Sequence, residues 1–126
     1  MNTALWIIAG VLAAAFLAGG VAKIIFSREK LIGYGRKLGE DLVGWIGRFP
    51  AAGVKAIGVL EILAAVGLIV PAALGIAPIL VPLAATGLVL LMAGAIVTHL
   101  RHRETRPVLG NILYLAMAAF VAVGRF

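Results

Sequence analysis

Two long runs of the sequence contain no Asp, Glu, Lys or Arg. The first extends from Met1 to Ala22, and the second extends from Ile62 to Leu100. A helix needs about 20 mainly apolar residues to cross roughly 30 Å of hydrocarbon, so the second run is too long for one crossing. Pro71, Gly75 and Pro78 interrupt it, and these residue types end or kink helices. We therefore divide the second run into two predicted membrane spans.

The composition is typical of a protein whose main solvent is lipid. Hydrophobic residues make up 63% and charged residues 13% of the 126 positions, and the mean hydropathy is +1.16. Soluble domains usually contain about 25% charged residues. The sequence also has no cysteine, which excludes disulfides, dithiol exchange and thiolate-bound iron–sulfur clusters or zinc. Any redox reaction would therefore need a bound cofactor.

We predict an all-α fold, a four-transmembrane-helix bundle that forms a single integral membrane domain over residues 1–126. The expected spans cover about residues 3–25, 51–70, 79–100 and 108–124. Each span is long enough to cross the hydrocarbon once. Four crossings nearly exhaust the length of the chain.

The connection between the first two spans, about residues 29–49, has the pattern of a helix on the membrane surface. Its apolar residues recur at spacings of three or four, while charged residues occupy the other faces. Glycines weaken this helix, each by about 1 kcal/mol relative to alanine. We favour an interfacial amphipathic anchor, with a cytoplasmic lid as the alternative. The apolar positions are Leu31, Tyr34, Leu38, Leu42, Trp45 and Phe49.

Basic residues are distributed unevenly between the two sides that this topology creates. Arg125 lies on the side of the termini, and the other ten lie on the side of the first and third connections. Because Lys and Arg accumulate in cytoplasmic loops, we expect both termini outside. This orientation signal explains the net charge of +6 without nucleic-acid binding, and membrane lipids are the expected partners. The ten residues are Lys23, Arg28, Lys30, Arg36, Lys37, Arg48, Lys55, Arg101, Arg103 and Arg106.

Glu61 is the acidic residue that a membrane span accommodates least easily. A rise of about 1.5 Å per residue places it roughly 15 Å deep, near the midplane of the bilayer. An acidic side chain there costs about 2.5–3.5 kcal/mol, so such a residue usually faces the bundle interior or a wet cavity. Lys23 lies near the inner end of the first span, where it could extend to the surface or turn toward Glu61.

His99 and Asn111 are expected at the same depth as Lys23, close to the cytoplasmic face. Together with Glu61, they could line a polar pocket that opens to the cytoplasm and contains an acid, a base, an imidazole and an amide. The competing interpretation is that Lys23 and Glu61 form an interhelical ion pair that only stabilises packing. The sequence leaves both interpretations open.

Metal binding and autonomous catalysis are not expected. His99 and His102 are spaced to share a helix face, but Arg101 and Arg103 flank them and no convincing third ligand accompanies them. The sequence contains no nucleophile with a partnered base, no glycine-rich phosphate loop and no dinucleotide-binding motif after a strand. The protein is therefore more easily explained as something other than an enzyme that acts alone.

Three segments resemble the DoxX-like family of small four-helix bacterial membrane proteins. They are GGVAK (Gly19 to Lys23), IGVLEILAAVGLIVP (Ile57 to Pro71) and PLAATGLVLLMAGAIVTHLRHRE (Pro82 to Glu104). The order of a lysine, a glutamate within a helix and a histidine at a helix end carries most of the resemblance. It implies a multi-pass protein of the bacterial inner membrane.

The resemblance also implies a role near redox chemistry, since family members are linked to quinone-dependent sulfur oxidation and to redox or detoxification partners. It assigns Lys23, Glu61 and His99 to the polar signature, whereas Asn111 rests on the depth argument alone. The cysteine pairs of some redox-associated relatives are missing here. Dithiol exchange is therefore not expected of this chain.

Three functions remain compatible with these residues. The leading one is binding of a small hydrophobic or quinone-like molecule, or a lipid, in a polar pocket near the cytoplasmic face, by a redox-associated accessory protein. The second is a small proton-coupled transporter that uses Glu61, which would need a homodimer because four helices make a narrow pathway. The third is a noncatalytic membrane scaffold or chaperone subunit, in a membrane complex, whose Glu61 and Lys23 pair with each other.

Overall fold

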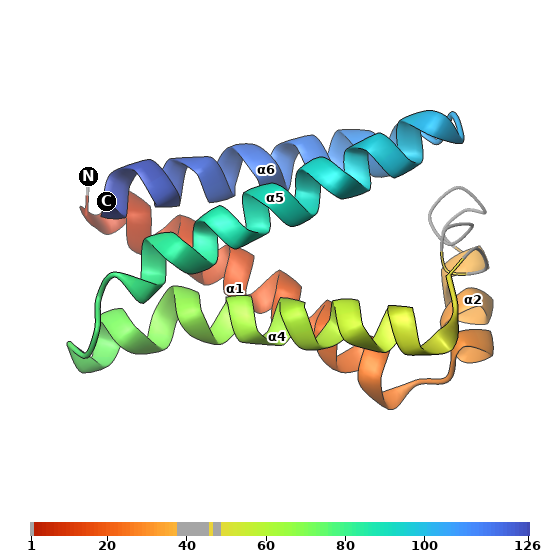
Figure 1. Cartoon of the computed structure of the whole chain (residues 1–126), viewed down its shortest axis with the longest axis horizontal. Helices are drawn as coiled ribbons and strands as arrows, with labels where there is room; N and C mark the ends of the chain where they lie inside the picture. Colours follow the sequence, from red (N-terminus) through yellow and green to blue (C-terminus); the bar gives the residue numbers. More distant parts are fainter. Residues whose placement is uncertain (1, 38–45, 47–48) are drawn as a thin grey trace.

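A computed structural model describes residues 2–37, 46 and 49–126, and their secondary structure is α-helical (Figure 1). Four helices are long and apolar enough to cross a membrane, and a short helix lies between the first two. These findings confirm the predicted all-α fold with four candidate spans. The helices are α1 (Asn2–Ile25), α2 (Arg28–Arg36), α4 (Ala51–Leu74), α5 (Leu80–Arg101) and α6 (Thr105–Arg125).

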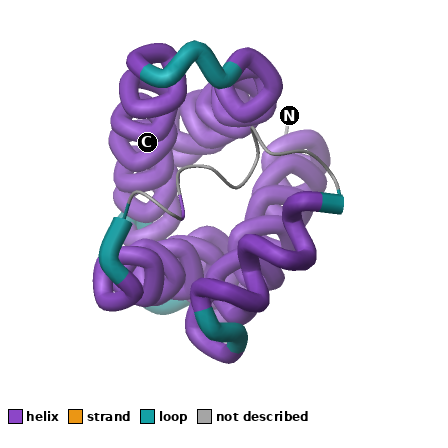
Figure 2. The backbone as a smooth tube through the Cα atoms, turned by 90° about the vertical axis from the view of Figure 1, so that its right-hand side faces the viewer, coloured by secondary structure: helices purple, strands orange, loops and turns teal. Residues whose placement is uncertain are grey.

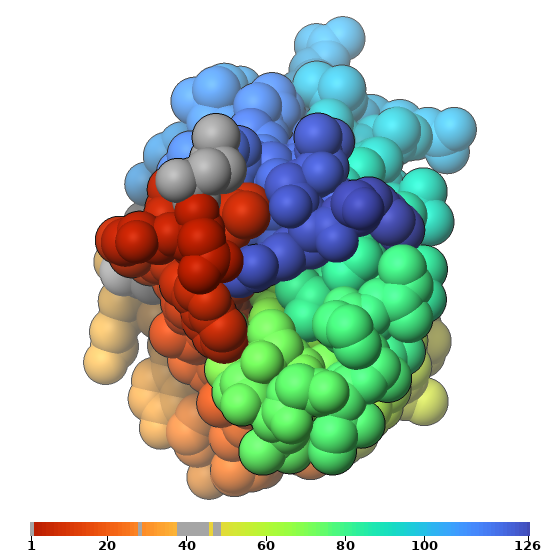
Figure 3. All heavy atoms as spheres, turned by 90° about the vertical axis from the view of Figure 1, so that its left-hand side faces the viewer, coloured from red at the N-terminus to blue at the C-terminus, as the bar shows by residue number. Residues whose placement is uncertain are grey.

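The four long helices form two closely packed pairs that close into a ring. α1 packs mainly against α4, and α5 packs mainly against α6, while contacts between α4 and α5 and between α1 and α6 join the pairs. Figure 2 shows the helices around the ring from one end. Both chain termini lie at the opposite end, where Figure 3 shows the first residues of α1 beside the end of α6. The helix pairs diverge toward the α2 end (Figure 1).

The second span is longer than predicted because Pro71 does not end it. α4 continues through Pro71 to Leu74 and stops at Gly75, whose φ of 67° is the left-handed conformation that glycine adopts readily. The backbone N–H of Gly75 donates to the carbonyl oxygen of Pro71, which satisfies one of the last carbonyl groups of the helix. A proline in the final turns removes only one intrahelical donor, so the helix tolerates it.

The fourth span begins at Thr105, three residues before the expected start at Val108. Pro107 is the third residue of α6. The first N–H groups of a helix have no intrahelical partner, so a proline there removes no backbone hydrogen bond. The sequence-based boundary was therefore placed too late.

The short helix α2 lies across one end of the bundle (Figure 1). It begins after Ser27, whose hydroxyl oxygen accepts a hydrogen bond from the backbone N–H of Lys30 at 3.2 Å. Leu31 and Ile32 pack against a small buried cluster of Ile46 and Val54. Within the segment 29–49, for which an interfacial helix was expected, the structure has a short helix that ends at Arg36. The expected apolar positions Leu38, Leu42 and Trp45 lie outside the described residues.

The main hydrophobic core fills the half of the bundle that lies toward the termini. Leu12, Leu68, Leu88 and Val121, one from each long helix, are almost completely buried there. Large apolar side chains also cover the outside of the bundle, for example Leu63 and Leu90. A helix in lipid gains nothing by hiding such residues from hydrocarbon, so this surface fits a membrane environment.

The backbones of α1 and α4 approach most closely at Gly20 and Gly58. A Cβ atom at Gly20 would lie 2.7 Å from the carbonyl oxygen of Gly58, and one at Gly58 would lie 2.9 Å from that of Gly20. No other residue type leaves space for this contact. Small residues allow membrane helices to pack by van der Waals contact where the hydrophobic effect does not drive them together.

Gly20→Ala is expected to lower the free energy of unfolding by about 1–3 kcal/mol, because the added methyl group forces α1 and α4 apart. Gly10→Ala in the same helix is the matched control, since nothing lies within 4 Å of a Cβ at that position. Unfolding of the two variants in detergent or bicelles measures the difference. Equal stability of Gly20→Ala and Gly10→Ala would contradict the close approach.

Candidate functional site

A cavity of about 630 Å³ lies between the four long helices in the half of the bundle nearer α2. Its walls come mainly from the C-terminal halves of α1 and α5 and the N-terminal halves of α4 and α6. Much of the lining is apolar or small, and the main hydrophobic core lies on the side of the cavity toward the chain termini. The polar lining side chains are Lys23, Glu61, Thr98, His99, Arg106, Asn111 and Tyr114.

Lys23 and Glu61 form an ion pair in the wall of this cavity. The ammonium nitrogen of Lys23, on the last turn of α1, lies 2.8 Å from Oε1 of Glu61, in the middle of α4. The Glu61 side chain is 8% exposed and that of Lys23 is 17% exposed. Lys23 therefore turns inward, which was one of the two orientations that the sequence allowed.

Gly19 provides the space that this ion pair occupies. A Cβ atom at Gly19 would lie 3.2 Å from Oε2 of Glu61 and 3.6 Å from Nζ of Lys23. Gly19 and Gly20 thus have different tasks, since the first accommodates the carboxylate and the second allows α4 to approach α1. A buried ion pair is stable only when its geometry is good, because removing two charges from water costs several kcal/mol per ion.

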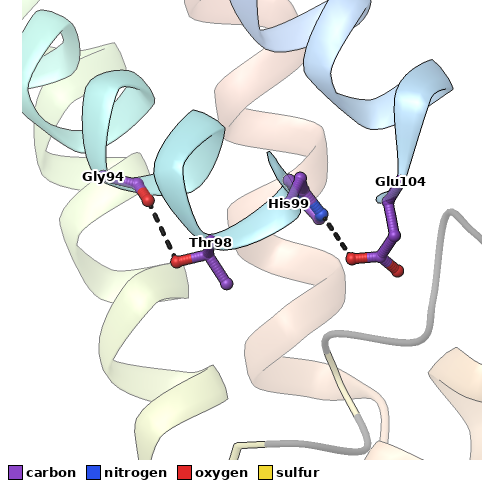
Figure 4. A network of polar contacts seen from close by, with 4 residues as sticks. All are labelled: Gly94, Thr98, His99 and Glu104. Carbon is purple, nitrogen blue, oxygen red and sulfur yellow. Dashed lines mark hydrogen bonds and ion pairs between the residues drawn. The ribbon is translucent and has the colours of Figure 1, made fainter. Parts of the chain in front are cut away.

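His99 lies on the last turn of α5 and contacts Glu104, the residue just before α6 (Figure 4). Nδ1 of His99 lies 2.9 Å from Oε1 of Glu104, and both side chains are more than nine-tenths buried. The turn between the helices produces this contact, because the backbone N–H of Glu104 donates to the carbonyl oxygen of His99. Arg103 in this turn has a φ of 56°.

Glu104 was missed by the sequence analysis. It follows Arg101, His102 and Arg103, so it reads as part of a charged, solvent-exposed connection. One feature of the sequence could have identified Glu104. It lies five residues after His99, just beyond the end of the third span, where a tight turn can bring the two side chains together. Only the backbone path of that turn decides whether they meet.

Asn111 also lines the cavity, from the second turn of α6. Its amide forms no hydrogen bond with another described residue, so its donor and acceptor atoms remain available to an occupant. One turn later, the ring of Tyr114 packs edge-on against Phe16, with ring centroids 5.3 Å apart. The four residues singled out from the sequence, Lys23, Glu61, His99 and Asn111, thus line one cavity.

The other charged residue of α4, Lys55, has a different role. Its ammonium nitrogen donates to the carbonyl oxygen of Ile24 at 2.8 Å, so it caps the end of α1. A cation at the C-terminus of a helix is favourable because the last carbonyl groups carry partial negative charge. This contact adds a second polar link between α1 and α4, outside the cavity.

The cavity suits a molecule that is apolar over most of its surface and carries a polar head. Cavities of about 300–1,000 Å³ with a few convergent polar groups are typical of small-molecule sites. The side chains present can exchange hydrogen bonds or protons with such a head. Within the described ranges, no three His, Cys, Asp or Glu side chains are grouped as metal ligands would be.

Comparison with known proteins identifies the family. The sequence model of the DoxX-like family matches residues 7–121, which is most of the chain. Searches of curated proteins and of solved structures found no match. The match covers α4 and α5 completely, most of α1 and α6, and the residues around the cavity. The chain therefore belongs to the DoxX-like family and is a multi-pass membrane protein with four candidate spans.

Proposed function

We propose that this protein binds a small hydrophobic or quinone-like molecule in the cavity and serves as a redox-associated accessory protein. The observation that carries the proposal is the combination of an apolar cavity of about 630 Å³ with a buried Lys23–Glu61 ion pair in its wall. Ionised groups at membrane depth are costly and usually have a function or a partner. Here they have a partner and also border a space large enough for a ligand.

Each polar side chain has a distinct task in this proposal. Glu61 accepts or donates a hydrogen bond or a proton at the ligand head, and Lys23 sets the charge of that carboxylate through the 2.8 Å contact. His99 and Asn111 orient the head from the opposite helix pair. The apolar side chains around them, such as Phe16 and Met92, would contact the rest of the ligand.

The location of the cavity suggests how the protein is oriented. The basic residues predicted to face the cytoplasm lie at the cavity end, including Lys23, Arg36, Lys55 and Arg101, whereas Arg125 lies at the end with the termini. We therefore propose that the cavity opens near the cytoplasmic face of the bacterial inner membrane, with membrane lipids around it. A redox role would use a bound cofactor and a partner in a membrane redox complex, because the chain has no cysteine for dithiol exchange.

The Glu61→Gln variant is expected to lose a co-purifying lipid or quinone that the wild-type protein retains. Its affinity for that ligand should fall at least about tenfold, because the ligand loses a hydrogen bond to a charged group. Native mass spectrometry of both proteins, released from the same membranes, measures the retained ligand. Thr86→Val is the control, because Thr86 lies on α5 away from the cavity and donates to its own helix at Pro82. Equal retention by wild type and Glu61→Gln would contradict the proposal.

A membrane scaffold is the second candidate, and the short Lys23–Glu61 distance favours it. In that case the ion pair would hold α1 and α4 together and the cavity would have no ligand. The two functions predict different effects of breaking the Lys23–Glu61 ion pair. In a scaffold, the ion pair affects stability alone, whereas in a binding protein it also affects ligand binding. Proton-coupled transport through Glu61 stays a prediction from the sequence.

Lys23→Met is expected to destabilise the protein by about 3–5 kcal/mol, because it leaves the buried carboxylate of Glu61 without its partner. Lys23→Met combined with Glu61→Leu should recover most of that loss, because no buried charge remains. Unfolding in detergent gives the coupling free energy. Strong coupling together with unchanged ligand retention in all variants would favour the scaffold, whereas additive effects would contradict a coupled pair.

A further inference from the structure

The His99 ring lies between a buried carboxylate and the cavity. Its Nδ1 atom is 2.9 Å from Oε1 of Glu104 (Figure 4). The His99 side chain also lines the cavity. Glu104 is not one of the cavity-lining residues, so it contacts His99 from behind.

This contact determines which ring nitrogen carries the proton. An ionised carboxylate only accepts hydrogen bonds, so an ionised Glu104 requires Nδ1 of His99 to be the donor. The other nitrogen, Nε2, has no hydrogen-bond partner among the described residues, and His99 is one of the residues that line the cavity. In a neutral imidazole with the proton on Nδ1, Nε2 has a lone pair and accepts a hydrogen bond.

Charged groups on three helices line the cavity beside this ring. Lys23 on α1 is paired with the carboxylate of Glu61 on α4, and Arg106 on α6 lines the same cavity. Glu104 is the acidic group in direct contact with His99, and it favours a proton on Nδ1 in either charge state of the ring.

We propose that Glu104 is a positioning residue that holds neutral His99 with its proton on Nδ1, so that Nε2 accepts a hydrogen bond from a hydroxyl group of the cavity's occupant. This inference rests on the proposed function and narrows its ligand class to apolar molecules with a hydroxyl head, such as a phenol or a hydroquinone. A carbonyl or ether head has no proton to donate to Nε2. The site therefore distinguishes ligands by their donor group.

The protonation of His99 can be read directly, because the chain has only two histidines. In protein labelled with nitrogen-15 at histidine, at mildly alkaline pH, we expect the His99 signals of the form protonated at Nδ1 alone. His102→Gln assigns the two sets of signals. Glu104→Met removes the acceptor and should move His99 to the form protonated at Nε2, which is intrinsically preferred in neutral imidazole.

Glu104→Gln provides the critical comparison. It loses the same charge as Glu104→Met but keeps an acceptor oxygen at the end of an equally long side chain, so it should retain the wild-type form of His99. Glu29→Gln, on the exposed surface of α2, controls for loss of an acidic residue. Wild-type His99 protonated at Nε2, or an unchanged spectrum in Glu104→Met, would overturn the proposal.

Ligand selectivity provides an independent readout. A para-alkylphenol should bind about tenfold more tightly than its methyl ether, the difference expected for one hydrogen bond, and Glu104→Met should bring the two affinities close together. Equal affinities in the wild type would overturn the acceptor role of Nε2 while leaving the proposed function standing. Binding of neither probe, in a protein whose His99 has the expected form, would instead overturn the ligand class.

Discussion

A lysine and a glutamate paired between two candidate membrane spans are the constraint on which this structure depends. The carboxylate of Glu61 is buried and needs a partner, and Lys23 supplies it only while α1 and α4 stay in register and in close contact. Gly20 and Gly58 make that contact possible, and Gly19 leaves room for the carboxylate. The apolar sequence inserts the helices, but the ion pair specifies which faces of α1 and α4 meet.

Buried apolar side chains fill one half of the bundle, and the main cavity lies in the other half. Toward the termini, side chains from all four long helices fill the centre, and Arg125 links the two ends of the chain by donating to Asn2 at 2.9 Å. Toward α2 the helix pairs diverge (Figure 1), and the polar side chains surround the space between them. The packed half fixes the positions of the four helices, and these helices also form the walls of the cavity. This arrangement is well suited to present a few polar groups with fixed geometry.

Prediction from sequence was most accurate for the membrane spans, where surrounding lipid restricts the backbone to helices in a chain of this kind. The four spans agree with the helices to within a few residues, because every backbone group in hydrocarbon must be hydrogen-bonded within a helix. The errors at Pro71 and Thr105 concern helix ends, where a proline can be tolerated in the terminal turns. Glu104 and Arg106 were not identified as site residues, because charged residues beside a span usually face water.

The sequence alone determined that the chain crosses a membrane in helices, and that Glu61 needs a partner or a polar environment, because both follow from transfer free energies that depend only on residue type. Only the tertiary structure decided that Lys23 is that partner, that Glu104 lies behind His99, and that an apolar cavity lies between the helix pairs. The reason is geometric, since these features depend on crossing angles and on one turn's backbone path, which residue types in isolation do not specify.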